Sequence, residues 1–99
     1  MIDLKRIVSF YWDAGNARNN EKHGVSQSEA EQAFFDPRLL MVPDPSHLDR
    51  EPRYHALAQT IDGRHLHITF TLRHEGTELR VISARDMHRK ERTHYDRKD

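Results

Sequence analysis

Side chains suited to acid–base and phosphate chemistry concentrate near the C-terminal end of the sequence. Arg85 stands where an expected strand meets an expected helix, and three further candidates follow it: His88, Glu91 and Tyr95. At 100° per residue, these three fall within about 60° of one another on one helix face. Cleaving RNA without a metal requires a base for the 2′-hydroxyl, a cation for the phosphorane and an acid for the 5′-oxygen. The four side chains cover those roles, although a solvated helix face with i, i+4 pairs fits the same spacing.

A metal-dependent site has weaker support. His65 and His67 place two imidazoles on one face of an expected strand, but zinc requires a third and usually a fourth ligand. We therefore expect an exposed polar face, no metal site and no cofactor. The sequence also contains no Gly-rich phosphate loop and no GxSxG or HExxH pattern. No sequence motif therefore supports a nucleotide-binding, serine hydrolase or zinc protease function.

The composition indicates a small cytoplasmic protein with one domain spanning residues 1–99. Hydrophobic residues make up 35% and charged residues 32%, and the mean hydropathy is −0.94. No run approaches the roughly 20 apolar residues needed to span a membrane, and the N-terminus lacks the apolar centre of a signal peptide. The absence of cysteine excludes disulfides, thiolate metal sites and cysteine nucleophiles.

The net charge of zero conceals an asymmetry. Residues 1–62 carry 7 Lys/Arg and 10 Asp/Glu, whereas residues 63–99 carry 9 and 6. A polyanionic partner is therefore expected to meet the C-terminal part first, although an ordinary mixed-charge surface gives the same numbers.

The elements that must position these residues are expected in the order β-α-α-β-β-β-α, an α+β fold with helices packed on one face of an antiparallel sheet. Ser26 and Glu29 have capping-box spacing before the second helix, which Asp36-Pro37 ends. Asp62-Gly63 predicts a two-residue hairpin turn, and Glu75-Gly76 closes the next hairpin. The expected strands are 7–12, 53–61, 64–74 and 78–84, the expected helices are 13–22, 26–35 and 86–97, and residues 43–52 are expected to form a loop.

Several motifs resemble the BrnT family, whose members are ribonuclease toxins of type II toxin–antitoxin systems. Near the N-terminus they are Phe10-Tyr11-Trp12-Asp13-Ala14-Gly15-Asn16 and Lys22-His23-Gly24-Val25-Ser26; near the C-terminus they are Ile82-Ser83-Ala84-Arg85-Asp86-Met87-His88-Arg89-Lys90-Glu91 and His94-Tyr95. The resemblance implies a RelE-like fold, a small antiparallel sheet flanked by helices. It also implies RNA cleavage that inhibits translation.

The resemblance, together with the chemistry above, gives a set of candidate site residues. The candidate catalytic residues are Arg53, Arg85, His88, Glu91 and Tyr95, and the candidate RNA-binding residues are Lys22, His23, Arg64, Arg80 and Arg89. Which of the catalytic residues is the base and which the acid stays open.

The resemblance further implies a partner. This is a cognate antitoxin with a ribbon-helix-helix-type DNA-binding domain, which neutralises the toxin. Operator DNA would be contacted only through the antitoxin, and a toxin–antitoxin heterotetramer is one expected assembly. The alternative is a catalytically silent binding module that acts with the antitoxin as a transcriptional co-repressor.

Overall fold

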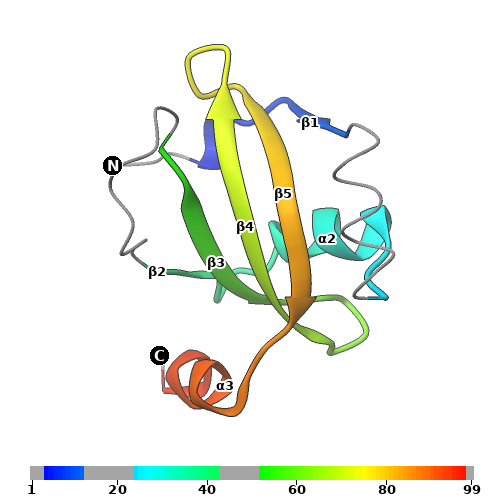
Figure 1. Cartoon of the computed structure of the whole chain (residues 1–99), viewed down its shortest axis with the longest axis vertical. Coiled ribbons are helices and arrows are strands. Elements are labelled where there is room, and N and C mark those ends of the chain that lie inside the picture. Colours follow the sequence, from blue (N-terminus) through cyan, green and yellow to red (C-terminus); the bar gives the residue numbers. More distant parts are fainter. Residues whose placement is uncertain (1–3, 13–23, 43–51, 98–99) are drawn as a thin grey trace.

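The computed structural model describes residues 4–12, 24–42 and 52–97 (Figure 1). In chain order the elements are a short 3-10 helix η1 (Leu4–Arg6), β1 (Ser9–Tyr11), α2 (Gln27–Ala33), β2 (Leu40–Val42), β3 (Tyr54–Gln59), β4 (His65–Arg73), β5 (Glu78–Asp86) and α3 (Arg89–Asp96). The α+β class is confirmed. The helix expected over 13–22 lies outside the described residues, and the RelE-like arrangement stays a prediction.

The five strands form one mixed sheet in the order β1-β5-β4-β3-β2. Strands β2 to β5 pair antiparallel, whereas β1 pairs parallel with β5. The prediction of a purely antiparallel sheet is therefore wrong at this edge. No tight turn joins β1 to β5, because α2 and three strands lie between them in the chain, and such a long connection permits parallel pairing.

Helix α2 forms as its capping residues predict. The Ser26 hydroxyl accepts a 3.0 Å hydrogen bond from the Glu29 backbone N–H, and the Glu29 carboxylate accepts one of 3.0 Å from the Ser26 N–H. Ala30 and Ala33 are fully buried on the helix face that packs on the sheet. The sheet side of this core is built from Ala56, Ala58, Leu66, Ile68, Phe70, Leu79, Val81 and Ala84.

Strand β2 was not expected from the sequence. Leu40–Val42 pairs antiparallel with β3, with Met41 opposite Ala56. Three consecutive apolar residues show neither the strand nor the helix period, so only the neighbouring edge of β3 makes this segment a strand.

The β3–β4 hairpin is longer at its turn than predicted. Strand β3 ends at Gln59 and β4 begins at His65, and the Thr60 N–H donates to the Arg64 carbonyl at 2.9 Å. Gly63 adopts a φ of +92°, which places the glycine in the left-handed part of a three-residue loop. The prediction of a two-residue turn at Asp62-Gly63 is therefore wrong.

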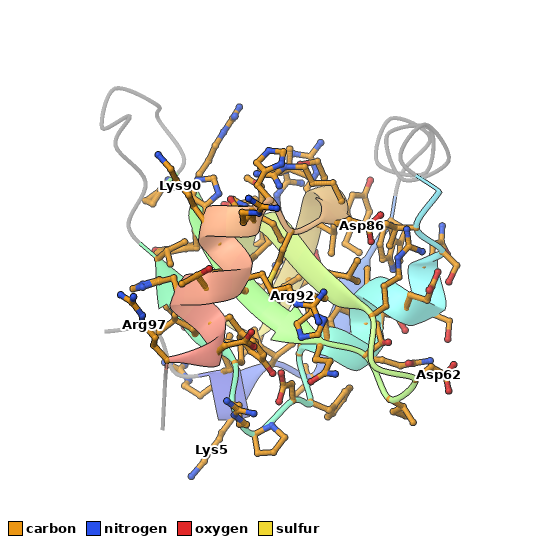
Figure 2. The ribbon with its side chains drawn as sticks, turned by 90° about the horizontal axis from the view of Figure 1, so that it is seen from below. Lys5, Asp62, Asp86, Lys90, Arg92 and Arg97 are labelled. Atoms are coloured by element: carbon orange, nitrogen blue, oxygen red, sulfur yellow. The ribbon has the colours of Figure 1, made fainter. Side chains whose placement is uncertain are left out.

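Helix α3 lies on the sheet face opposite to α2, so the expectation that helices pack on one face is also wrong. Its buried Tyr95 packs edge-on against His65 at a ring-centroid distance of 5.5 Å, and His65 alternates along β4 with Leu66, which faces α2. Seen from below, the strands pass between the two helices (Figure 2). The helix begins at Arg89 and not at Asp86, because β5 continues through Asp86, which pairs with Leu66. The sheet thus has an apolar face under α2 and a polar face beside α3.

Candidate functional site

The polar face of the sheet places side chains from three strands next to one another. On β4, His67 and Thr69 point away from the α2 side. Across the ladder His67 pairs with Leu57 of β3 and with Arg85 of β5, while Thr69 pairs with His55. Because paired residues on one face have neighbouring side chains, this register brings imidazole and guanidinium groups together.

Helix α3 adds a carboxylate to this group. Glu91 accepts hydrogen bonds from both terminal nitrogens of Arg85, at 2.8 Å to Oε1 and 3.0 Å to Oε2. The backbone N–H of His88, the N-cap residue of α3, also donates to Glu91 Oε1 at 2.9 Å. The capping geometry therefore directs Glu91 back toward the sheet. We refer to His55, His67, Arg85 and Glu91 as the His–Glu–Arg cluster.

The protonation of His67 follows from its contacts. Its Nδ1 lies 2.5 Å from Glu91 Oε2, a distance at which Nδ1 must carry a hydrogen and donate it to the carboxylate. Arg85 Nη2 is also 2.8 Å from the same Nδ1. Because a protonated Nδ1 has no lone pair to accept with, we assign the hydrogen bond from Nη2 to Glu91 Oε2. In the neutral ring the lone pair is then on Nε2, which lies 2.9 Å from His55 Nδ1. His55 Nδ1 is also 3.1 Å from the Thr69 hydroxyl.

Within the cluster, the pKa values of both Glu91 and His67 are lowered. Burial alone would raise the pKa of Glu91, but the hydrogen bonds from Arg85, His88 and His67 outweigh it and hold the pKa at about 2. Burial lowers the pKa of His67 below 6.5, and this outweighs the opposing effect of Glu91. At neutral pH the cluster therefore holds an ionised carboxylate and a neutral imidazole ready to accept a proton.

An open hollow of about 350 Å³ adjoins the cluster. His55, His67 and Glu91 all line it, so the cluster is accessible from this side. Within the described ranges no three His, Asp or Glu side chains converge as metal ligands, and both Glu91 oxygens are held by Arg85.

Of the candidate catalytic residues, the structure brings Arg85 and Glu91 into direct contact. His88 is exposed at the N-cap of α3 and touches Glu91 through its backbone. Arg53 is exposed just before β3, four residues from Leu57, the residue opposite His67. At about 3.3 Å per residue, this places the Arg53 backbone about 13 Å along the strand from the cluster.

Tyr95 occupies a structural position. The residue is 1% exposed, and its hydroxyl donates a 2.6 Å hydrogen bond to Asp36 Oδ2. Asp36 Oδ2 also accepts from the Gln59 N–H at 2.8 Å, so the contact ties α3 to the segment after α2 and to β3. Burial and the hydrogen bond to Asp36 raise the pKa of Tyr95 to about 12. We therefore assign Tyr95 to packing and leave it out of the reacting groups.

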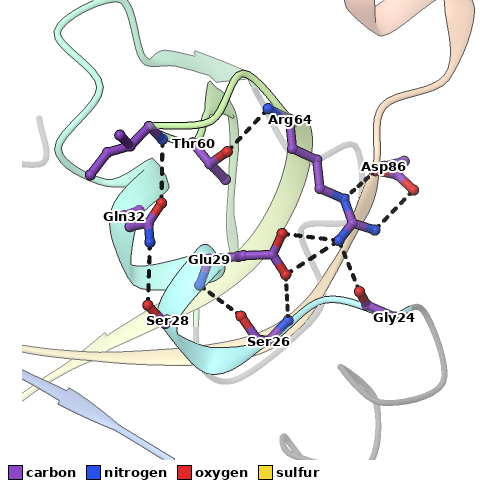
Figure 3. Close-up of polar contacts among 9 residues, drawn as sticks. Gly24, Ser26, Ser28, Glu29, Gln32, Thr60, Arg64 and Asp86 are labelled. Atoms are coloured by element: carbon purple, nitrogen blue, oxygen red, sulfur yellow. Dashed lines mark hydrogen bonds and ion pairs between the residues drawn. The ribbon is translucent and has the colours of Figure 1, made fainter.

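Arg64, a candidate RNA-binding residue, is engaged within the protein (Figure 3). Its guanidinium donates to both oxygens of Asp86, at 2.7 and 3.1 Å, and to the Gly24 carbonyl at 2.8 Å. Nη1 also lies 3.2 Å from Glu29 Oε2. These bonds join the β3–β4 hairpin to the end of β5 and the start of α2. Arg64 therefore stabilises the fold.

The remaining RNA-binding candidates are placed differently. Arg80 is half-buried in β5, opposite Thr71 of β4 and Tyr11 of β1. Arg89 is exposed on the first turn of α3. Lys22 and His23 lie outside the described residues.

Two members of the cluster, His55 and His67, were missed as catalytic candidates from the sequence. The alternation of β4 places His67 on the polar face, but the sequence pattern indicates only an exposed histidine or, less well, a zinc ligand there. The pairing of β4 with β5 places His67 beside Arg85, and local sequence patterns do not predict the register between two strands.

A comparison with protein families bears on this geometry. A family model described as the ribonuclease toxin BrnT of type II toxin–antitoxin systems matches residues 12–91. The chain belongs to this family. The BrnT match contains all four residues of the His–Glu–Arg cluster and ends at Glu91, whereas Tyr95 lies beyond it. A search of curated proteins finds no significant match. Across the described ranges, this BrnT chain has no helix long and apolar enough to cross a membrane.

Proposed function

We propose that the chain is a metal-independent endoribonuclease of a toxin–antitoxin system and that the His–Glu–Arg cluster is its catalytic centre. One observation carries the proposal: a guanidinium, an imidazole and a carboxylate from two strands and a helix meet beside an open hollow. Membership of a family of ribonuclease toxins supports the same reaction class.

The cluster supplies a base for the first step. The 2′-hydroxyl loses its proton to the His55–His67 imidazole pair as its oxygen attacks the adjacent phosphorus. Glu91 accepts from Nδ1 of His67 and stabilises the imidazolium that forms, in the way that a buried carboxylate orients a catalytic histidine. A carboxylate with a pKa of about 2 is a weak base, so Glu91 positions the imidazole and does not itself take the proton.

Two roles remain: a cation must stabilise the phosphorane, and an acid must protonate the departing 5′-oxygen. Arg85 stabilises the extra negative charge of the phosphorane, which matters most in the partly desolvated site. The exposed imidazole of His88 is our candidate acid for the departing 5′-oxygen. Breaking the bond from phosphorus to the 5′-oxygen leaves a 2′,3′-cyclic phosphate and a 5′-hydroxyl. Arg53, Arg80 and Arg89 are proposed contacts to flanking phosphates.

The expected partner is an antitoxin with a ribbon-helix-helix-type DNA-binding domain, in a heterotetramer that reaches operator DNA only through the antitoxin. A short adjacent reading frame that encodes a ribbon-helix-helix-type protein would support this part of the proposal, and its absence would count against it. RNA as substrate places the action in the cytoplasm.

The test is cleavage of RNA oligonucleotides by the purified chain in the presence of EDTA. We expect cleavage to a cyclic phosphate, none when the scissile nucleotide is 2′-deoxy, and a loss of about 100-fold or more in Arg85→Ala. Arg92→Ala, which removes an exposed arginine of α3, is the matched control. Induction of the chain should arrest growth, and Arg85→Ala should relieve the arrest.

The silent co-repressor is the second candidate, and the bidentate pair between Arg85 and Glu91 favours it, because both groups satisfy each other without substrate. It predicts a tight complex with a small DNA-binding protein. Intact RNA after incubation with folded protein, together with harmless induction, would decide for this alternative.

A further inference from the structure

The hollow beside the cluster is a slot between α3 and the β2 side of the sheet. Its deepest residues are Leu57, which is 1% exposed, and His67. Val42 of β2 and His55 of β3 line one side, and α3 lines the other with Lys90, Glu91 and His94. Lys90 and His94 are exposed and therefore form the rim.

The size and lining of the slot suit a small, mostly apolar group. A volume of about 350 Å³ lies at the small end of the range for pockets that hold single small molecules, and it is too small for a helix of a protein partner. Val42 and Leu57 provide aliphatic surface, and His94 provides an aromatic ring at the rim. Proteins that read single-stranded RNA hold splayed bases against such aromatic and apolar side chains.

The charges around the slot also suit a nucleotide. Among the described residues that line it, Glu91 is the only acidic one, and Arg85 neutralises its carboxylate through two hydrogen bonds. Lys90 adds a positive charge at the rim, where a sugar–phosphate backbone would pass. The described lining of the slot therefore offers an anionic chain no uncompensated negative charge.

We propose that this slot is a nucleobase subsite, which takes the base next to the scissile phosphate of a single-stranded RNA. This inference rests on the proposed ribonuclease function. The slot and the catalytic cluster share His55, His67 and Glu91, so a base seated in the slot holds its own ribose against the cluster. The slot thus selects substrates with an unpaired base at the cleavage point and excludes a base-paired one.

The substrate arm of the test uses an RNA oligonucleotide with one cleavage site and two versions carrying an abasic ribose on either side of the scissile phosphate. We expect one abasic version to lose about 5- to 150-fold in kcat/KM with the unaltered protein, the range for one stacked base. Equal kcat/KM for the parent and both abasic oligonucleotides would overturn the proposal.

The protein arm uses Val42→Trp, which fills the slot, and His94→Ala, which removes an exposed ring and so leaves the fold intact. Both should lower cleavage of the parent RNA and should cancel most of the penalty for the abasic version, because the base no longer has a subsite to lose. Arg92→Ala should behave as the unaltered protein. An unchanged abasic penalty in both variants would contradict the proposal.

A binding measurement separates this inference from the proposed function. If no RNA is cleaved, fluorescence anisotropy with 2′-deoxy-substituted parent and abasic oligonucleotides still reports on the slot. Tighter binding of the parent, lost in His94→Ala, supports the subsite even without catalysis. Equal binding of both, or a defect of His94→Ala confined to antitoxin binding, overturns it.

Discussion

Replacing Glu91 by Gln would remove the charge at the centre of the cluster with little change in shape. The carboxylate accepts hydrogen bonds from Arg85, His67 and the backbone of His88. A Gln side chain has one accepting oxygen, and its amide group would face donors of Arg85 or His67. We therefore expect the variant to lose both stability and RNA cleavage.

The magnitude follows from the pKa of Glu91. Lowering it from 4.5 to about 2 on folding corresponds to about 3 kcal/mol of stability at neutral pH. The side chain is 23% exposed, and solvent screening reduces this figure, so we expect a loss of about 1.5 to 3 kcal/mol. For a domain of this size the melting temperature should fall by roughly 6 to 15 °C.

The stabilisation from Glu91 should decrease as the pH falls. Because folding depresses the pKa of Glu91, its contribution is fully present above pH 4.5 and is lost as the pH falls toward 2. Urea unfolding of both proteins at pH 7 and pH 3 should show the difference in the free energy of unfolding shrink by more than half at pH 3. Glu75→Gln, at an exposed turn, should change stability by less than about 0.5 kcal/mol at either pH. A Glu91→Gln difference that stays constant with pH would refute the reasoning.

Three further predictions concern Arg64 and Tyr95, which lie outside the cluster, and His67, which belongs to it. Arg64→Met should cost about 1–2 kcal/mol in urea unfolding, because it leaves Asp86 and Glu29 without their partner, and should leave the affinity for RNA unchanged. Tyr95→Phe should cost about 1–3 kcal/mol through the lost hydrogen bond to Asp36, while the cleavage rate of the folded fraction stays within about twofold. The acid limb of the pH–rate profile should have its midpoint below pH 6.5, because burial lowers the pKa of His67 and cleavage needs its neutral form; a midpoint above 6.5 would contradict this assignment.

Local signals in the sequence predicted those elements whose cause is itself local. The Ser26–Glu29 capping box fixes the start of α2, and the alternation of β4 identifies its buried and polar faces. Strand β2 and the parallel pairing of β1 were missed, because they depend on which edge of the sheet is open and not on periodicity. The turn at Gly63 was identified but its length was wrong, since an Asp-Gly pair serves both two- and three-residue loops.

In the candidate site, too, the sequence predicted features with local causes and missed those that depend on long-range pairing. Arg85 and Glu91 were predicted as catalytic residues, and the fold places them in contact, but their roles rest on the proposed function. Helical spacing grouped Tyr95 and His88 with Glu91, yet the helix turns Tyr95 into the protein and leaves His88 exposed. His67 enters only through the register between strands, a long-range property that single-sequence patterns do not contain.

The most direct test of the catalytic cluster is the single-turnover rate of RNA cleavage in EDTA by His67→Ala, compared with His65→Ala as a matched control on the same strand face. We predict a loss of about 100-fold or more for His67→Ala, with the fold intact by circular dichroism, and a rate within about threefold of the unaltered protein for His65→Ala. Cleavage by His67→Ala at the unaltered rate, or equal losses in both variants, would contradict a catalytic centre built on Glu91, His67 and Arg85.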